Sequence, residues 1–133
     1  MSKANLDVVQ GVYVSFGAGD VPAILATLTE DVRWEVVGPA GTYPLFGERS
    51  GVAGALEFFQ LVGEHEDFTE FTPLQFLTDG DKVVVLGRAA YTLKKTGRSV
   101  ATDWVHVFTL RGGKVSGFQE IADSAQILAG YAA

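Results

Sequence analysis

The side chains that could carry out chemistry in this sequence are imidazoles, carboxylates and phenols, because its 133 residues include no cysteine. That absence excludes thiol catalysis, a disulfide framework and thiolate metal sites. The two histidines, His65 and His106, lie on different predicted elements without a ligand pair at helical spacing, so we expect no metal site. The run EHED at 64–67 lies between a predicted helix and a predicted strand, where a charge cluster is usually a solvated turn, and we expect it to have no role.

The candidate catalytic residues are His106 and Glu120. Strand alternation puts His106 on one face with Trp104 and Phe108, and it puts Glu120 on one face of the next strand with Phe118. If both faces point inward, the two side chains are neighbours across an antiparallel pair. An apolar cavity raises the pKa of a carboxyl group and a neighbouring imidazolium lowers it, so such a pair is poised for proton transfer near neutral pH. Enolisation, aldol closure and dehydration need such a group.

Each of these two residues also has a structural interpretation. An isolated histidine on an apolar strand is often a hydrogen-bonded core residue. The last strand is apolar on both faces, so a slip of one residue would turn Gln119 inward and leave Glu120 in solvent. We expect Asp103 at a rim or in an ion pair with Arg88, on the face opposite His106.

Aromatic side chains are the candidate substrate-binding residues, because an aromatic wall suits a flat, largely apolar ligand. A filled core is the alternative for most of them. The expected cavity lining is Tyr13, Phe16, Trp34, Phe59, Tyr91, Trp104 and Phe118. Tyr43 and Phe46 belong to a long loop and could close over the mouth of the pocket, or pack at a subunit interface.

The elements that position these residues are predicted to be two helices, a strand, a third helix and then four strands. Apolar spacing predicts a helix over 4–16, then a short helix that starts at Asp20-Pro22 and includes Ile24, Leu25 and Leu28. A third helix starts at Ser50, buries Val52, Ala55, Leu56 and Phe59, and ends at Gly63. Strands are predicted over 31–37, 67–77, 82–94, 99–110 and 114–122, a loop over 38–47, and a helical turn in the tail from 123.

Tight-turn residues between the last four strands predict an antiparallel meander, and the segregation of helices from strands predicts an α+β fold. Both alternating faces are largely apolar in 83–90 and 104–108, whereas a sheet with one wet face alternates with polar residues. The outer sheet face therefore needs a cover. We expect a homodimer formed through this face.

The composition narrows the class of protein further. The chain has the length of a single domain, 1–133, and a formal net charge of −6, which disfavours nucleic acid and anionic membranes as partners. No signal-peptide pattern or apolar run of about 20 residues is present, so we expect a cytoplasmic protein. The segment GAGDVP at 17–22 imitates a dinucleotide fingerprint, but its third glycine is proline and it follows a helix. We expect no cofactor.

Several short segments occur in an order and spacing that resemble the SnoaL-like branch of the nuclear transport factor 2-like superfamily. They are FGAGD at 16–20, EDVRW at 30–34, GP at 38–39, FF at 58–59, GDKVVVLG at 80–87, WVHVF at 104–108 and GKV at 113–115. The resemblance spans about residues 4–124. It implies a cone-shaped α+β barrel, cystatin-like or nuclear transport factor 2-like, in which a curved antiparallel sheet wraps a long N-terminal helix and encloses a deep pocket, usually in a homodimer.

The family includes ketosteroid isomerases, polyketide cyclases, epoxide hydrolases, dehydratases and noncatalytic domains, so the resemblance leaves the activity open. The oxyanion-hole tyrosine of the steroid isomerases falls at Val12, one place before Tyr13, and their general base falls at Val36. Their protonated acid falls at His106, whose imidazole could donate a hydrogen bond instead. Because two of the three positions are lost, steroid isomerisation is disfavoured. The cyclases are similar to this chain in a histidine on the penultimate strand and an acid on the last strand, which here are His106 and Glu120.

Two functions follow as hypotheses. The first is a cofactor-independent isomerase, cyclase or dehydratase that acts on a small, largely apolar or aromatic carbonyl compound. The second is a noncatalytic ligand-binding or dimeric assembly domain of the same fold. A cavity in which the polar ends of His106 and Glu120 converge favours the first, and a cavity filled by tryptophan and phenylalanine favours the second.

Overall fold

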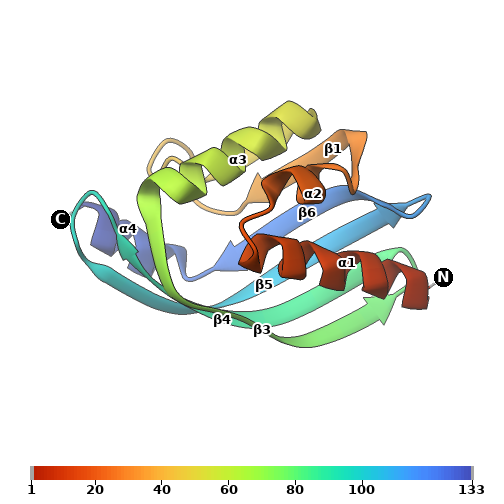
Figure 1. Ribbon diagram of the computed structural model, residues 1–133. Coiled ribbons are helices and arrows are strands. Elements are labelled where there is room, and N and C mark those ends of the chain that lie inside the picture. Colours follow the sequence, from red (N-terminus) through yellow and green to blue (C-terminus); the bar gives the residue numbers. More distant parts are fainter. Residues whose placement is uncertain (1, 133) are drawn as a thin grey trace.

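The computed structural model describes residues 2–132 and shows a curved six-stranded sheet with three helices on its concave side (Figure 1). The elements are α1 (Ser2–Gly17), α2 (Val21–Leu25), β1 (Leu28–Val36), β2 (Gly47–Ser50), α3 (Gly51–His65), β3 (Glu66–Asp79), β4 (Lys82–Leu93), β5 (Ser99–Arg111), β6 (Lys114–Ala122) and α4 (Ser124–Ala132). The strand order is β2-β1-β6-β5-β4-β3. This architecture confirms the predicted cone-like α+β fold.

The first two helices form where apolar spacing and turn residues place them. Val9 and Val12 of α1 are buried, and Gly19 has a φ of 69°, a left-handed conformation that lets the chain turn into α2. The side chain of Asp20 caps α2 by accepting a hydrogen bond from the backbone N–H of Ala23 at 3.2 Å. Leu28 was predicted in this helix, but it begins β1, because α2 ends at Leu25.

The segment from 38 to 65 departs from its prediction in two ways. The loop after β1 ends in the short strand β2, which pairs antiparallel with β1 and was not predicted. The helix α3 continues past Gly63 to His65, and its buried side chains are those of Ala55, Phe58 and Val62. The side chain of Leu56, predicted to be buried, is 38% exposed, so the buried stripe lies further round the helix.

The last four strands form the predicted antiparallel meander, joined through tight glycine turns. β6 then pairs in parallel with β1, so the strand before the long loop lies beside the end of the meander. This parallel pairing was not predicted. It brings Trp34 of β1 opposite Phe118 of β6, and the two rings stack with centroids 4.1 Å apart.

The two faces of the sheet differ in burial. On β4 and β5 every second side chain faces the helices and is buried, including those of Val85, Trp104 and His106. On the outer face Val84 pairs with Val107 and Leu86 with Val105, and these apolar side chains are only partly buried. A partner subunit that covers this face stays a prediction.

The C-terminal tail forms α4, which is longer than the predicted helical turn and packs at the end of β5. The side-chain carbonyl of Gln126 accepts a hydrogen bond from the backbone N–H of Ala101 at 2.8 Å and holds α4 to that strand. Within residues 2–132, no helix has both the length and the apolar character needed to cross a membrane.

Candidate active site

The concave face of the sheet, α1 and α3 enclose a small cavity with a volume of about 50 Å³. Seven of the predicted site residues line it, namely Tyr13, Phe16, Trp34, Phe59, His106, Phe118 and Glu120. Nine further lining residues were not predicted as site residues, namely Val12, Ile24, Leu45, Phe58, Val62, Glu66, Phe68, Phe71 and Phe108. The cavity is therefore mainly aromatic, and five of its lining side chains carry polar atoms, namely Tyr13, Trp34, Glu66, His106 and Glu120.

His106 and Glu120 meet across the β5–β6 pair, as strand alternation predicts. They occupy opposed positions in the register, and Nε2 of His106 lies 2.9 Å from Oε1 of Glu120. Gln119 points to the other face, where its amide donates a hydrogen bond to Glu35 at 3.0 Å. The register of the last strand therefore turns Glu120 inward.

Tyr13 joins this pair from α1. Its hydroxyl oxygen lies 2.7 Å from Nδ1 of His106, and the planes of the two rings are 3° apart. Val12 also lines the cavity, but it has no polar atom to offer. The resemblance places a tyrosine at position 12, but the phenol of this site comes from position 13. The two positions lie about 100° apart around the helix.

The directions of these hydrogen bonds follow from the chemistry of the groups. A carboxylate only accepts, so the proton of the neutral imidazole is on Nε2 and is donated to Glu120. Nδ1 is then the acceptor, and the Tyr13 hydroxyl donates to it. Tyr13, His106 and Glu120 form one continuous hydrogen-bonded chain, which we call the Tyr–His–Glu chain.

Burial raises the pKa of the Tyr13 phenol well above its usual value, and the negative charge of Glu120 raises it further. Tyr13 therefore keeps its proton at neutral pH. It acts as a donor within the Tyr–His–Glu chain at rest, since a phenolate next to a carboxylate in an apolar cavity is strongly disfavoured.

Trp104 and Tyr91 were predicted to line the cavity, but neither is among the residues that line it. Trp104 stacks on His106 with centroids 3.9 Å apart, and it lies over Gly87, where a Cβ atom would come within 2.1 Å of the indole. Tyr91 packs against Phe68, with centroids 5.3 Å apart. The buried face of a strand includes residues that line the cavity and residues that do not. Alternation along the strand does not distinguish the two.

Tyr43 and Phe46 do not close over the mouth of the cavity, as was expected of their loop. Both are buried, their rings are 5.2 Å apart, and Tyr43 also packs edge-on against Tyr131 of α4 at 4.9 Å. They line a separate surface hollow together with Gly41 and Thr42. The hydroxyl of Tyr43 donates a 2.7 Å hydrogen bond to Oε2 of Glu66, a residue that lines the main cavity.

Glu66 was expected to belong to a solvated turn without a role, and the structure contradicts this. It is the first residue of β3, it is partly buried, and it lines the cavity. Burial raises the pKa of its carboxyl group to about 8, helped by the charge of Glu120 and opposed by the hydrogen bond from Tyr43. The acidic run gave no signal of this, because burial of Glu66 depends on the loop that carries Tyr43.

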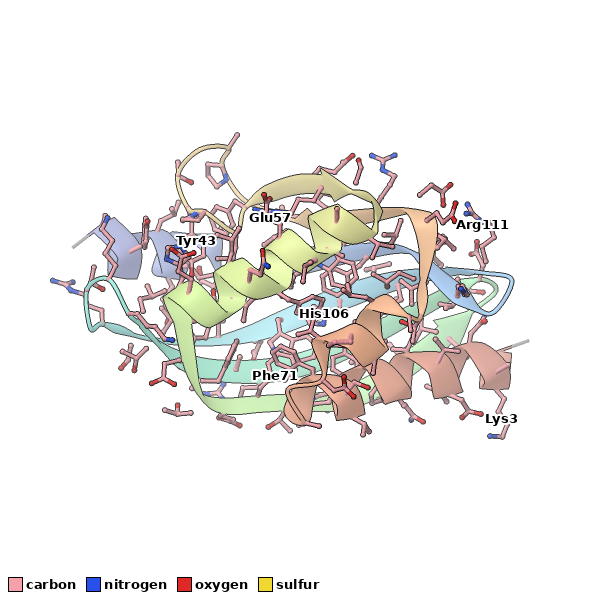
Figure 2. All side chains as sticks on the ribbon, turned by 45° about the horizontal axis from the view of Figure 1, so that its top comes forward. Lys3, Tyr43, Glu57, Phe71, His106 and Arg111 are labelled. Carbon is pink, nitrogen blue, oxygen red and sulfur yellow. The ribbon has the colours of Figure 1, made fainter. Side chains whose placement is uncertain are left out.

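The mouth of the cavity is marked by the phenylalanine rings that are only partly buried, Phe16, Phe59, Phe68 and Phe71. Phe16 and Phe71 have centroids 4.9 Å apart. Figure 2 shows Phe71 and His106 near α1, with Tyr43 toward the C-terminal end of α3. A volume of about 50 Å³ holds a few water molecules, so a cyclic ligand enters only when rings at the mouth rotate.

The charged groups of the outer face are separate from this cavity. Arg88 and Asp103 form an exposed ion pair with Nη1 and Oδ1 3.4 Å apart, as expected for side chains opposite His106. In the part of the chain that the structure describes, no three histidine or carboxylate side chains are grouped so as to hold a metal ion.

Comparisons with known proteins agree on a family and on a fold. The model of the SnoaL-like domain matches residues 9–118. An NTF2-like protein of unknown function from Burkholderia pseudomallei K96243 is 30% identical, with a TM-score of 0.90 and 100% of each chain covered. TerC, whose structure was determined after co-crystallization with polyporic acid, is 29% identical, with a TM-score of 0.87 and 98% of this chain and 99% of TerC covered.

A proposed SnoaL-like polyketide cyclase from Jannaschia sp. CCS1 is 21% identical, with a TM-score of 0.83 over 99% of this chain and 94% of its own. That similarity concerns the fold alone. No curated protein matches the chain.

Proposed function

The chain belongs to the SnoaL-like domain family, and we propose that it is an acid–base enzyme that isomerises, cyclises or dehydrates a small, largely apolar carbonyl compound. The observation that carries the proposal is the Tyr–His–Glu chain, which lies in the wall of an apolar cavity. A histidine that is hydrogen-bonded on both sides by cavity-lining groups can receive and return a proton. Each of these reactions is driven by proton transfer without net oxidation or reduction, so the proposal includes no cofactor.

Tyr13 is the member of the Tyr–His–Glu chain that would contact the substrate. Both nitrogens of His106 already have hydrogen-bond partners, and its side chain is 5% exposed. His106 therefore reaches a substrate through one of its partners. Tyr13 is only partly buried, and its hydroxyl oxygen keeps lone pairs that can accept a proton.

The proposed step begins when the C–H bond next to the substrate carbonyl group breaks. Its proton binds to the Tyr13 oxygen, while the proton that Tyr13 held moves to Nδ1 of His106. The electron pair of the C–H bond enters the enolate. Transfer of a proton from Tyr13 to the enolate oxygen or to another carbon, with return of the His106 proton to Tyr13, completes enolisation or isomerisation.

Glu120 supports this step without moving a proton. Its carboxylate accepts the hydrogen bond from Nε2, which keeps Nδ1 free to act as the base. It also stabilises the imidazolium that forms, as the acid of a serine-protease triad does. The face of Trp104 stacked on His106 adds a favourable cation–π contact in that state.

The lining supports a flat and largely apolar ligand. Trp34 and Phe118 form a stacked wall on the β1–β6 side. TerC was co-crystallized with polyporic acid, and that compound is the first ligand to test on this chain.

The test is the exchange of α-protons of 2-tetralone, a flat ketone, followed by proton NMR in D₂O. We expect the wild-type protein to accelerate exchange over buffer, and His106→Gln to lose at least about 99% of the acceleration. Glu57→Gln is the matched control. Glu57 is on the exposed side of α3, where it accepts a hydrogen bond from Nε of Arg49, and it does not line the cavity. Exchange that is equal in wild type and buffer would remove the proposal.

A noncatalytic ligand-binding domain is the second candidate, favoured by the small volume of the cavity and its aromatic lining. The two functions differ in one measurement. A binding domain shifts the NMR signals of residues around the cavity when polyporic acid or 2-tetralone is added, but it leaves the α-proton exchange rate at the buffer value.

A further inference from the structure

We propose that Glu66, held by Tyr43, is a second acid–base residue of the cavity, and that it protonates a hydroxyl group of the substrate as that group leaves. The substrate class is then β-hydroxy carbonyl compounds, and the reaction is loss of water. This inference rests on the proposed function, because it requires the Tyr–His–Glu chain to remove the proton from carbon.

The position of Glu66 provides a second polar site in an otherwise apolar wall. Glu66 lies at the junction of α3 and β3, whereas the Tyr–His–Glu chain is built from α1, β5 and β6. Tyr43 donates to Oε2 of Glu66 at 2.7 Å, which fixes the carboxyl group. Within the described residues Oε1 makes no hydrogen bond, so that oxygen is available to a ligand.

Three features of the surroundings favour the protonated form of Glu66. The carboxyl group faces an apolar lining, so burial penalises its charge. Glu120 lies in the wall of the same cavity, and two carboxylates in one apolar site repel each other. The backbone N–H of Glu66 bonds to the Val62 carbonyl, so Glu66 lies at the C-terminal end of α3, where the helix dipole disfavours a negative charge.

Among the titratable groups of this region, Glu66 is the one that can donate a proton to a substrate. Burial raises the pKa of Tyr43 and of Tyr91, so both phenols keep their protons. Lys94 is the nearby cation, and its ammonium group donates to the Gly63 carbonyl at 2.7 Å on the exposed side. The remaining neighbours are His65 and Tyr131, which pack around the Tyr43 ring, and Lys95, which lies over the Tyr131 ring. The pKa of Glu66, raised to about 8, agrees with this assignment.

The proposed reaction balances without a further reactant. The α C–H bond breaks, and its proton passes to Tyr13 as the proton of Tyr13 passes to His106. The electron pair forms the new C=C bond. The β C–O bond breaks with its electron pair on oxygen, which takes the proton of Glu66 and leaves as water. His106 then loses one proton to solvent and Glu66 gains one, which restores the starting state.

The experiment compares two rates in the same protein samples. One is the dehydration of 4-hydroxy-4-phenylbutan-2-one to 4-phenylbut-3-en-2-one, followed by ultraviolet absorbance. The other is α-proton exchange of 2-tetralone. We expect Glu66→Gln to lower the ratio of dehydration to exchange at least 100-fold, because an amide N–H is far too weak an acid to protonate the leaving hydroxyl group. Glu64→Gln, an exposed neighbour on α3, is the matched control and should leave both rates unchanged.

A pH profile separates proton donation from a merely structural role. We expect the dehydration rate of the wild type to fall above about pH 8, as Glu66 ionises. Because the Tyr43 hydrogen bond lowers the pKa of Glu66, Tyr43→Phe should move this fall to higher pH. Carbon-13 NMR of labelled glutamate carboxyl groups, assigned with Glu66→Gln, checks the same titration without any substrate.

The possible results are distinct. Exchange without dehydration in the wild type, or an unchanged ratio in Glu66→Gln, would overturn the role of Glu66 and leave the proposed function intact. A Glu66 carboxyl signal that titrates near pH 4.5 would also overturn it. Absence of exchange in the wild type would instead count against the proposed function.

Discussion

The hydroxyl oxygen of Tyr13 on α1 and Nδ1 of His106 on β5 lie 2.7 Å apart, although 93 residues separate them in the chain. This contact ties the first helix to the centre of the sheet. It also turns the cross-strand pair of His106 and Glu120 into a chain of three groups that ends at a cavity.

Replacement of Tyr13 by phenylalanine should lower the acceleration of 2-tetralone exchange by roughly 100-fold or more, because the proton then has no path from carbon to His106. The free energy of unfolding should also fall by about 1–3 kcal/mol, because the buried Nδ1 of His106 loses its hydrogen-bond donor although the ring of residue 13 remains. Tyr91→Phe is the matched control, because it removes the hydroxyl of a buried tyrosine that does not line the cavity. If Tyr13→Phe and Tyr91→Phe lose the same fraction of the exchange activity, the Tyr13 hydroxyl does not transfer the proton.

Glu120→Gln should reverse the tautomer of His106. In the wild type Nε2 carries the proton and donates to the carboxylate. An amide N–H can donate to Nε2, which moves the proton to Nδ1 and makes Tyr13 the acceptor. Long-range ¹⁵N–¹H NMR of the His106 ring distinguishes the two tautomers. Glu35→Gln on the outer face should leave the signals unchanged, and a protonated Nδ1 in the wild type would contradict the prediction.

Glu66 should make the protein less stable as the pH rises. The pKa of its carboxyl group is about 8 in the folded state and about 4.5 in an unperturbed carboxyl. Between these values the folded state binds more protons than the unfolded state, so the free energy of unfolding falls with pH, by at most about 1.4 kcal/mol per pH unit. The contribution is fully present below pH 4.5 and is lost as pH approaches 8.

This pH dependence is measured by urea unfolding of the wild type and Glu66→Gln at pH 5, 6, 7 and 8. The amide cannot ionise, so we expect the variant to gain stability relative to the wild type as pH rises. Glu64→Gln should follow the wild-type curve. A constant difference between wild type and Glu66→Gln would show that Glu66 has an ordinary pKa.

Gly87→Ala should destabilise the protein by about 1–3 kcal/mol, because the new Cβ would overlap the Trp104 indole. Trp104 stacks on His106, so the exchange activity should fall as well. Gly11→Ala is the control, since its Cβ would meet nothing within 4 Å in an exposed part of α1. That variant should gain up to about 1 kcal/mol. A Gly87→Ala protein as stable as wild type would contradict the packing described here.

The outer sheet face should form the homodimer interface. Light scattering at micromolar concentration is expected to give the mass of two chains for the wild type. Val105→Lys should give the mass of one chain. Burying the lysine charge in the apolar interface without an opposite charge beside it is strongly disfavoured. Val14→Lys, at a side chain that is 74% exposed on α1, should remain dimeric. A monomeric wild type would remove this prediction.

The sequence by itself determined the order of the helices and strands other than β2, and much of the site. The period of two in WVHVF at 104–108 puts His106 on the buried face, and the same period puts Glu120 opposite it, because alternation is a local property of a strand. Helical spacing likewise located α1 and showed that it has a buried face. Local patterns of this kind depend on a few neighbouring residues, so they remain the same when the elements pack together.

Only the tertiary structure decided which groups share the cavity. Tyr13 rather than Val12 meets His106 because the packing of α1 on the sheet sets the rotation of the helix, and periodicity allows either. Glu66 is drawn out of solvent because α3 extends to His65 and a loop 23 residues earlier in the chain places Tyr43 against its carboxyl group. Burial of a charge at an element boundary depends on distant segments, so no local pattern encodes it.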